Sequence, residues 1–273
     1  AACLILLSTC FRAQGDFDAA VREAQRAVDL DPANSSTPLA LGGVEYGRRR
    51  FDEAERAFKR ALELSPNLIA ATLGLAAVTY SKGDMEETVR LLKSLLKRIP
   101  DDLAAVTTLA DVYMAQGKPK LAQDLCQEVT ARHPDFYSLR AKLALIQIQS
   151  GNINAGYTTA NAVLKDKPDD IATRLILADL FLRSGLPSIA EEHCWKALEV
   201  NAGLVAANKL LARALLDQGA AQRAVTGLEP LAAALKDDLD TQLLLSVAHG
   251  RTGGFGKAEA WLKKAAAAHP ESA

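Results

Sequence analysis

The fold is decided by residues 35–68, SSTPLALGGVEYGRRRFDEAERAFKRALELSPNL, because this 34-residue pattern can be laid over the whole chain without an insertion. Two punctuating residue types follow the same spacing. They are the prolines Pro32, Pro66, Pro100, Pro134, Pro168 and Pro270 and the glycines Gly15, Gly83, Gly117, Gly151, Gly185, Gly219 and Gly253. Ala202 and Lys236 interrupt the proline series, and Arg49 takes the place of the missing glycine. Two residue types that share one period indicate a tandem array of repeats.

Each repeat has the pattern of two helices joined by a short turn. Within Asp52–Leu64, the residues Ala54, Phe58 and Ala61 form an apolar stripe at helical spacing, which is typical of an amphipathic helix. The turn before it, Arg48–Phe51, is short enough to make the two helices antiparallel. Glycine after the first helix supplies the left-handed backbone that ends it, and proline separates one repeat from the next.

The second repeat resembles the tetratricopeptide repeat. It carries Leu41 and Gly42 in its first helix and Ala54, Phe58, Ala61 and Pro66 in and after its second. The fourth and sixth repeats show the pattern in Leu109, Ala110, Tyr113, Gly117, Ala122 and Pro134 and in Leu177, Ala178, Phe181, Gly185, Ala190 and Ala197. The resemblance implies an all-α fold, a right-handed superhelical solenoid of eight helix-turn-helix repeats. We expect one domain over residues 1–273, with repeats 1–34, 35–68, 69–102, 103–136, 137–170, 171–204, 205–238 and 239–272.

A few positions depart from the family pattern. Pro38 and Arg140 replace a large apolar residue, Thr88 and Gly156 replace a small alanine, and Glu45 occupies an aromatic position with Tyr46 beside it. The departures are local and leave the 34-residue register intact.

Charge and hydropathy exclude two classes of partner. The chain has 32 Lys and Arg against 33 Asp and Glu, a formal net charge of −1. Nucleic acids and anionic membrane surfaces attract proteins with a basic field, so neither is an expected partner. The most apolar run, residues 1–10, is much shorter than the roughly 20 residues that cross a bilayer, so no membrane span is expected.

The four cysteines are too far apart to pair within the chain. Cys3 and Cys10 lie seven residues apart on one predicted helix, about 10 Å along its axis. Cys126 and Cys194 hold the same place two repeats apart, roughly 20 Å if neighbouring helices are spaced by about 10 Å. A disulfide needs Cα atoms within about 7 Å. A chain without disulfides suits the cytoplasm and also a bacterial periplasm, so the compartment stays open.

The N-terminal run AACLILLSTC, residues 1–10, allows two interpretations. It can be the first helix of the first repeat, because Leu4, Leu7 and Phe11 fall on the repeat register. It can also be the apolar part of a secretion signal that ends at a lipid-acceptor Cys10, although the positively charged start of such a signal is missing. As a helix it would be apolar on every side, whereas the end of a solenoid needs a polar outer face.

This uncovered face leads to a prediction of self-association. We expect Leu4, Leu7 and Phe11 to contact a second copy of the chain or further repeats of a longer array.

No catalytic, cofactor or metal site is predicted. The sequence has no CxxC, HExxH, phosphate loop or glycine-rich dinucleotide turn. His193 and Cys194 are adjacent, but neighbouring helical positions point about 100° apart, and Cys194 falls on the buried register, which favours a packed thiol. The paired acids Asp101–Asp102 and Asp237–Asp238 fall between repeats, where they are expected to cap helices, and Asp169 and Asp170 are expected to do the same.

The tetratricopeptide resemblance implies a concave groove lined by first helices. Two known groove chemistries are missing: residues such as Leu39 and Gly43 occupy places of the carboxylate clamp for chaperone tails, and Leu6, Ala40 and Gly74 occupy places of the asparagine ladder of O-linked GlcNAc transferase. What remains is an apolar stripe with tyrosines. The predicted groove residues are Leu39, Tyr46, Leu73, Tyr80, Met114 and Leu175. The aliphatic members could simply pack first helices together, whereas the tyrosines offer a large contact area with little loss of entropy.

The sequence therefore favours a non-catalytic scaffold that binds a partner peptide or helix in its groove. One alternative is a structural segment of a longer or self-stacking array, like those of bacterial exopolysaccharide-export and envelope assemblies. Another is the repeat appendage of an enzyme. The bacterial comparison is analogy, since no residue here is specific to those systems.

Overall fold

The computed structural model describes residues 1–235 and 237–269, so Lys236 and Pro270 of the repeat lattice lie outside the described residues. The described chain is helical throughout and contains no strand. Its helices are α1 (Ala2–Ala13), α2 (Phe17–Leu30), α3 (Ser36–Gly47), α4 (Phe51–Leu64), α5 (Ile69–Ser81), α6 (Met85–Arg98), α7 (Leu103–Ala115), α8 (Pro119–Arg132), α9 (Tyr137–Gln149), α10 (Ile153–Asp166), α11 (Ile171–Arg183), α12 (Pro187–Val200), α13 (Val205–Asp217), α14 (Ala221–Ala234), α15 (Leu239–Arg251) and α16 (Phe255–Ala268).

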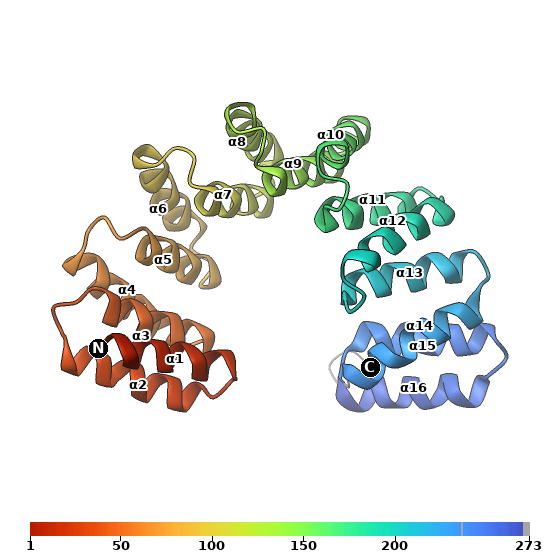
Figure 1. The fold of residues 1–273 in the computed structure, drawn as a ribbon, viewed down its shortest axis with the longest axis horizontal. Coiled ribbons are helices and arrows are strands. Elements are labelled where there is room, and N and C mark those ends of the chain that lie inside the picture. The colour runs from red at the N-terminus through yellow and green to blue at the C-terminus, as the bar shows by residue number, and fades with distance from the viewer. Residues whose placement is uncertain (236, 270–273) are drawn as a thin grey trace. The chain divides into compact units, whose positions relative to one another are not determined.

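Two compact halves make up the chain, the N-terminal half Ala1–Arg132 with α1–α8 and the C-terminal half from His133 onward with α9–α16. Each 34-residue repeat holds one pair of helices, which confirms the predicted all-α solenoid of helix-turn-helix repeats (Figure 1). Within each half, every helix packs against the next one in the chain, and each first helix also packs against the first helix of the following repeat. First helices are therefore enclosed on several sides, which explains their apolar composition.

The turn inside each repeat requires a left-handed residue. Gly83 has φ +84°, and Arg49, the residue that replaces glycine in the second repeat, adopts φ +62°. A side chain at such a φ is strained by its Cβ. The repeat geometry therefore imposes this backbone conformation even where the sequence does not supply glycine.

Small residues in the second and third repeats make room for one aromatic ring. Phe58 of α4 is buried, and a Cβ added to Gly42 of α3 or to Gly74 of α5 would lie 2.8 Å or 2.6 Å from its ring. The ring thus fills the space between three helices of two successive repeats. Because protein interiors are close-packed, neither glycine can take a side chain unless the ring moves.

The alanine positions of the family pattern are the close approaches between paired helices. Ala54 and Ala122 are both fully buried. Where threonine replaces this alanine, the Thr88 hydroxyl lies 2.8 Å from the Thr79 hydroxyl and donates to the Asp84 carbonyl at 2.7 Å, so the polar group is satisfied. Where glycine replaces it, a Cβ on Gly156 would lie 2.7 Å from the backbone oxygen of Ala144, so this pair of helices is closer still.

Acidic residues cap helices at only some of the expected places. Asp102 accepts a hydrogen bond from the Ala105 amide at 2.8 Å, and Asp170 accepts one from the Thr173 amide at 2.9 Å. Asp101, which was also expected to cap, instead pairs with Arg132 at 2.6 Å. Only one acid of each pair lies at the N-cap position, and its neighbour is one residue too early.

Candidate protein-binding surface

Two tyrosines stand out on the first helices of the N-terminal half. Tyr46 near the end of α3 and Tyr80 near the end of α5 are 34 residues apart and hold the same place in successive repeats. Their exposed fractions are 36% and 38%, so both rings present surface to a partner. Tyrosines of a core would instead have their rings enclosed by neighbouring side chains.

Tyr46 is held in place by contacts on both sides. Its hydroxyl lies 3.1 Å from the Ser81 hydroxyl of the next repeat, and its ring centroid lies 5.9 Å from that of Phe51 at a tilt of 54°. The aromatic contact and the hydrogen bond restrict the side chain before any partner binds. Such preorganisation reduces the entropy lost on binding.

The aliphatic residues of the predicted stripe are partly buried. Leu39 packs against the core cluster that contains Phe58, and Leu73 and Met114 are partly buried as well. Leu175 lies in the C-terminal half, where it packs against that half's own core. These residues contribute to helix packing, and only the two tyrosines of the predicted set are exposed.

The small residues beside the tyrosines have different reasons to be small. A Cβ on Gly47 would lie 2.9 Å from the Phe17 ring, so packing against the first repeat requires glycine there. At Gly43 the nearest atom to an added Cβ is Nη1 of Arg12 at 3.8 Å, so this position is open. Glycine at position 43 therefore leaves this part of the α3 surface without a side chain, although the packing would allow one.

The corresponding face of the C-terminal half is charged, a feature that the prediction of an apolar groove missed. A cavity of about 440 Å³ there is lined by Asp179, Leu182, Arg183, Arg213, Leu216, Asp217, Leu244 and Arg251. Arg183 pairs with Asp179 at 2.8 Å, whereas Arg213 and Asp217 form no ion pair with any residue of the described chain. The sequence could have shown this charge. The charged residues of the lining occupy the ninth and thirteenth places of their repeats, which point into the groove in the family pattern.

Neither His193 nor Cys194 forms a reactive site. Cys194 is fully buried, and burial raises the pKa of its thiol to about 12. The His193 ring stacks on Phe181 with a centroid distance of 5.6 Å, and its Nδ1 is buried without a hydrogen-bond partner. Burial and then the nearby charge of Arg174 lower the pKa of His193. The expected packed thiol is confirmed.

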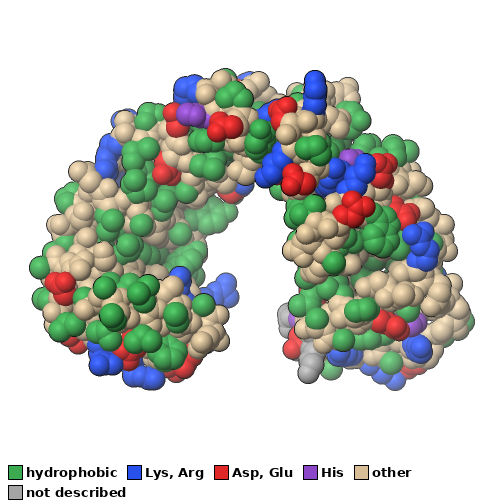
Figure 2. All heavy atoms as spheres, viewed as in Figure 1, with side chains coloured by type: hydrophobic (Ala, Val, Ile, Leu, Met, Phe, Trp, Pro, Cys, Tyr) green, Lys and Arg blue, Asp and Glu red, His purple; other side chains and the backbone are tan. Residues whose placement is uncertain are grey.

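The predicted self-association surface is only partly exposed. In Figure 2 hydrophobic side chains gather over α1, where Leu7 is exposed and Leu6 is 66% exposed. Leu4 is partly buried, and Phe11 packs against the core cluster of Ala20, Ala24 and Val44. The exposed large apolar residues of α1 are therefore Leu6 and Leu7.

Two further absences concern the described residues alone. No helix among them has the length and the hydropathy to cross a bilayer. No group of three or more histidine, cysteine, aspartate or glutamate side chains within residues 1–235 and 237–269 is arranged to hold a metal ion.

Comparison with protein families decides the classification. One family model, described as tetratricopeptide repeat, matches residues 45–111, 80–143 and 113–180, and a second with the same description matches residues 5–69. The chain belongs to the tetratricopeptide repeat family. A search of curated proteins finds no match.

Solved structures share the fold. A tetratricopeptide repeat protein from Parabacteroides merdae is 19% identical over 90% of this chain and 97% of its own, with a TM-score of 0.68. Yeast Tom70 is 14% identical over 93% of this chain, which spans 55% of Tom70, with a TM-score of 0.76. A thermophilic TPR protein of Thermus thermophilus is 25% identical over 67% of this chain and 99% of its own, with a TM-score of 0.56. These likenesses show the fold of the chain.

Proposed function

We propose that this tetratricopeptide array is a non-catalytic scaffold whose N-terminal half binds a peptide or helix of a partner protein across Tyr46 and Tyr80. The observation that carries the proposal is the partial exposure of both rings at equivalent places of adjacent repeats. The aliphatic residues beside them pack the helices and leave the tyrosines as the exposed aromatic anchors. Aromatic anchors of this kind carry a large share of the energy at protein interfaces.

The chemistry of this face favours an apolar partner segment. Gly43, Gly47 and Ser81, each within three residues of a tyrosine in the sequence, are small and uncharged, and a nearby charge is the Arg12 guanidinium beside Gly43. A segment that buries apolar side chains against the rings would avoid the desolvation of charges. Its affinity should therefore change little between low and high salt, since screening acts on charged pairs.

A peptide-display selection against the whole chain tests the proposal. Peptides selected on the wild-type protein should bind the Tyr46→Ala/Tyr80→Ala variant about 30-fold more weakly, which corresponds to about 2 kcal/mol. Tyr157→Ala is the matched control, because Tyr157 is similarly exposed but lies on a second helix of the C-terminal half. Selected peptides that bind the double variant as tightly as the wild type would contradict the proposal.

A second candidate function is assembly of copies through α1. It is favoured by the exposed Leu6 and Leu7, since exposed apolar side chains that lie together mark association surfaces. The predicted set of Leu4, Leu7 and Phe11 contributes one exposed residue to this surface. In this role the array would be a structural segment of a larger assembly.

A further inference from the structure

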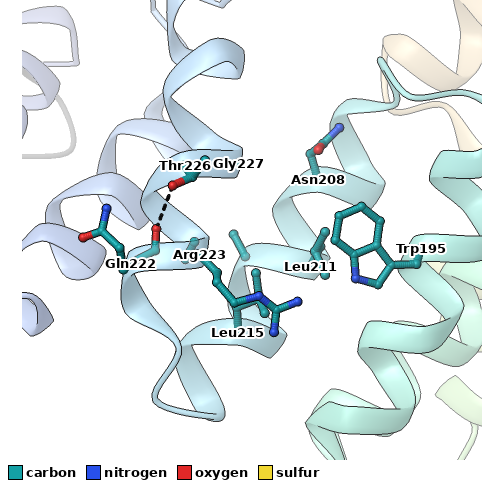
Figure 3. A pocket seen from close by; sticks show the side chains of 10 residues that line it. Trp195, Asn208, Leu211, Leu215, Gln222, Arg223, Thr226 and Gly227 are labelled. Atoms are coloured by element: carbon teal, nitrogen blue, oxygen red, sulfur yellow. Dashed lines mark hydrogen bonds between the residues drawn. The ribbon is translucent and has the colours of Figure 1, made fainter.

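A cavity of about 330 Å³ lies between α12, α13 and α14 of the C-terminal half (Figure 3). It is lined by Trp195, Asn208, Leu211, Ala212, Leu215, Gln222, Arg223, Ala224, Thr226 and Gly227. In Figure 3 the Trp195 indole lies on one side, next to Leu211, and Gln222, Arg223 and Thr226 of α14 lie on the other. Because its walls come from the second helices α12 and α14, the cavity does not belong to the face that carries the tyrosines.

The floor of the cavity is apolar, and the α14 wall has a gap at Gly227 between polar residues. Leu211 and Leu215 of α13 are buried beneath it. Gly227 leaves the α14 wall without a side chain, and a Cβ added there would meet no atom within 4 Å. The same place three repeats earlier holds Leu125. Glycine inside a helix is less favourable than alanine or leucine, so local helix stability does not explain Gly227.

One carboxylate, Glu191 of α12, links the Trp195 side of the cavity to the α14 side. Glu191 accepts hydrogen bonds from the Trp195 indole at 3.2 Å, from Arg223 at 2.6 Å and from Gln218 at 2.8 Å. Burial opposes ionisation of Glu191, but the hydrogen bonds from Gln218, Arg223 and Trp195 outweigh it and lower the pKa of this carboxyl. The ionised carboxylate holds the indole in place and compensates the charge of Arg223.

The mouth of the cavity is open and carries a hydrogen-bond acceptor. Trp195 is 47% exposed, so a small free molecule would remain substantially in contact with water. The Asn208 amide nitrogen donates to the carbonyls of Ala202 and Leu204, while its oxygen accepts no hydrogen bond from the described chain. An incoming N–H group can be satisfied at this edge.

We propose that this cavity holds a neutral aromatic side chain of tryptophan size from a partner protein. Its volume is about twice the roughly 150 Å³ that accommodates benzene, which fits a bicyclic ring. The compensated charge disfavours an ionic group. Small-molecule sites bury about 70–90% of the surface of their ligand. The mouth of this cavity is open, so we expect the rest of a partner protein to cover the inserted side chain. The inference extends the scaffold role and is independent of Tyr46 and Tyr80.

Titration with N-acetyl-L-tryptophanamide tests the proposal on the whole chain. The protein has two tryptophans, so nitrogen-15 NMR shows two indole N–H signals. The Trp195 signal should shift to saturation, with a dissociation constant on the order of 1 mM or tighter, while the Trp261 signal stays in place. N-acetyl-L-alaninamide should shift neither. The absence of a shift up to the solubility limit, or equal shifts of both signals, would overturn the proposal.

Variants of the α14 wall provide the matched comparison. Gly227→Leu should weaken binding at least tenfold, whereas Gly256→Leu in α16, where an added Cβ also meets no atom within 4 Å, should not. If Gly227→Leu does not fold, Gly227→Ala should still raise the melting temperature and weaken binding several-fold. Unchanged binding in the Gly227 variants would show that the ligand binds outside this cavity and would overturn the proposal.

Two further experiments are needed. One tests whether the cavity binds a side chain of a partner protein or a small molecule, and the other tests whether this proposal is independent of the one on Tyr46 and Tyr80. 3-Methylindole should bind more weakly than N-acetyl-L-tryptophanamide, because it lacks the peptide groups that meet the mouth of the cavity. Equal or tighter binding of 3-methylindole would assign the cavity to a small molecule and refute the protein partner. The Tyr46→Ala/Tyr80→Ala variant should bind N-acetyl-L-tryptophanamide as well as the wild type does, so the groove proposal can fail without affecting this one.

Discussion

The hydroxyl of Tyr46 lies 3.1 Å from the hydroxyl of Ser81, which belongs to the next repeat. The contact joins two first helices on the face that carries the exposed tyrosines. It links the second and third repeats and leaves the Tyr46 ring partly exposed.

The Tyr46–Ser81 contact should add little to stability. Tyr46→Phe and Ser81→Ala should each lower the free energy of unfolding by about 0.5 kcal/mol, and the double variant should lose no more than either, because one exposed hydrogen bond is removed in all three. Chemical denaturation of the four proteins gives the coupling energy. Additive losses would show that the two hydroxyls act independently.

Adjacent glycines of α3 should respond to alanine in opposite directions. Gly42→Ala should lower the free energy of unfolding by about 1–3 kcal/mol, because the added methyl group meets the buried Phe58 ring at 2.8 Å. Gly43→Ala, where the nearest atom is 3.8 Å away, should raise it by about 0.5–1 kcal/mol through helix propensity. Thermal or denaturant unfolding distinguishes them. A change of the same sign at both positions would contradict this packing.

Replacing Arg49 by glycine should stabilise the protein. Arg49 has φ +62°, a conformation that disfavours side chains by about 1–2 kcal/mol, and the greater freedom of glycine in the unfolded chain offsets roughly 0.5–1 kcal/mol of the gain. The net increase in unfolding free energy should be about 0.5–1 kcal/mol. Arg48→Gly is the control, since Arg48 has φ −78° and ion pairs with Asp18 and Glu45, so this variant should lose stability. A lower melting temperature for Arg49→Gly would refute the strain.

Stability should fall as the pH drops below about 6.5 because of His193. Burial and the charge of Arg174 lower the folded-state pKa of this residue below its usual value of 6.5. The unfolded chain therefore binds more protons than the folded one in this window, and stability that is present above pH 6.5 is lost as the pH falls toward the folded pKa.

His193→Gln should reduce this pH dependence of the unfolding free energy between about pH 7 and pH 5. Denaturant titrations at several pH values measure both slopes. Equal slopes for wild type and His193→Gln would rule out this residue as the cause.

Self-association through α1 should appear as a concentration-dependent mass in sedimentation. Leu6→Lys/Leu7→Lys should reduce it, because charges on this exposed face oppose apolar contact. Leu30→Lys is the control, since Leu30 is 66% exposed like Leu6 but lies at the end of α2. A wild-type chain that remains monomeric at high concentration would exclude this assembly.

The sequence alone determined the repeat length, the helix pairs and their turns. The reason is local: glycine at a left-handed turn, proline between repeats and alanine at the helix crossing each act within one or two repeats, so a 34-residue period carries them all. Arg49 is an example: its place in the 34-residue register marks the left-handed turn position although the residue is not glycine, and its φ is positive in the structure. The burial of Cys194 followed from the same register.

Only the tertiary structure decided which residues of a face are available. Tyr46, Leu39 and Leu73 belong to one predicted stripe, yet exposure depends on how neighbouring helices cover each side chain, and only the tyrosine is left open. The cavity beside Trp195 depends on three helices and on the absence of a side chain at Gly227, a combination that no periodicity shows. A repeat pattern specifies where helices lie, whereas the unfilled space between them is set by the particular side chains that meet there.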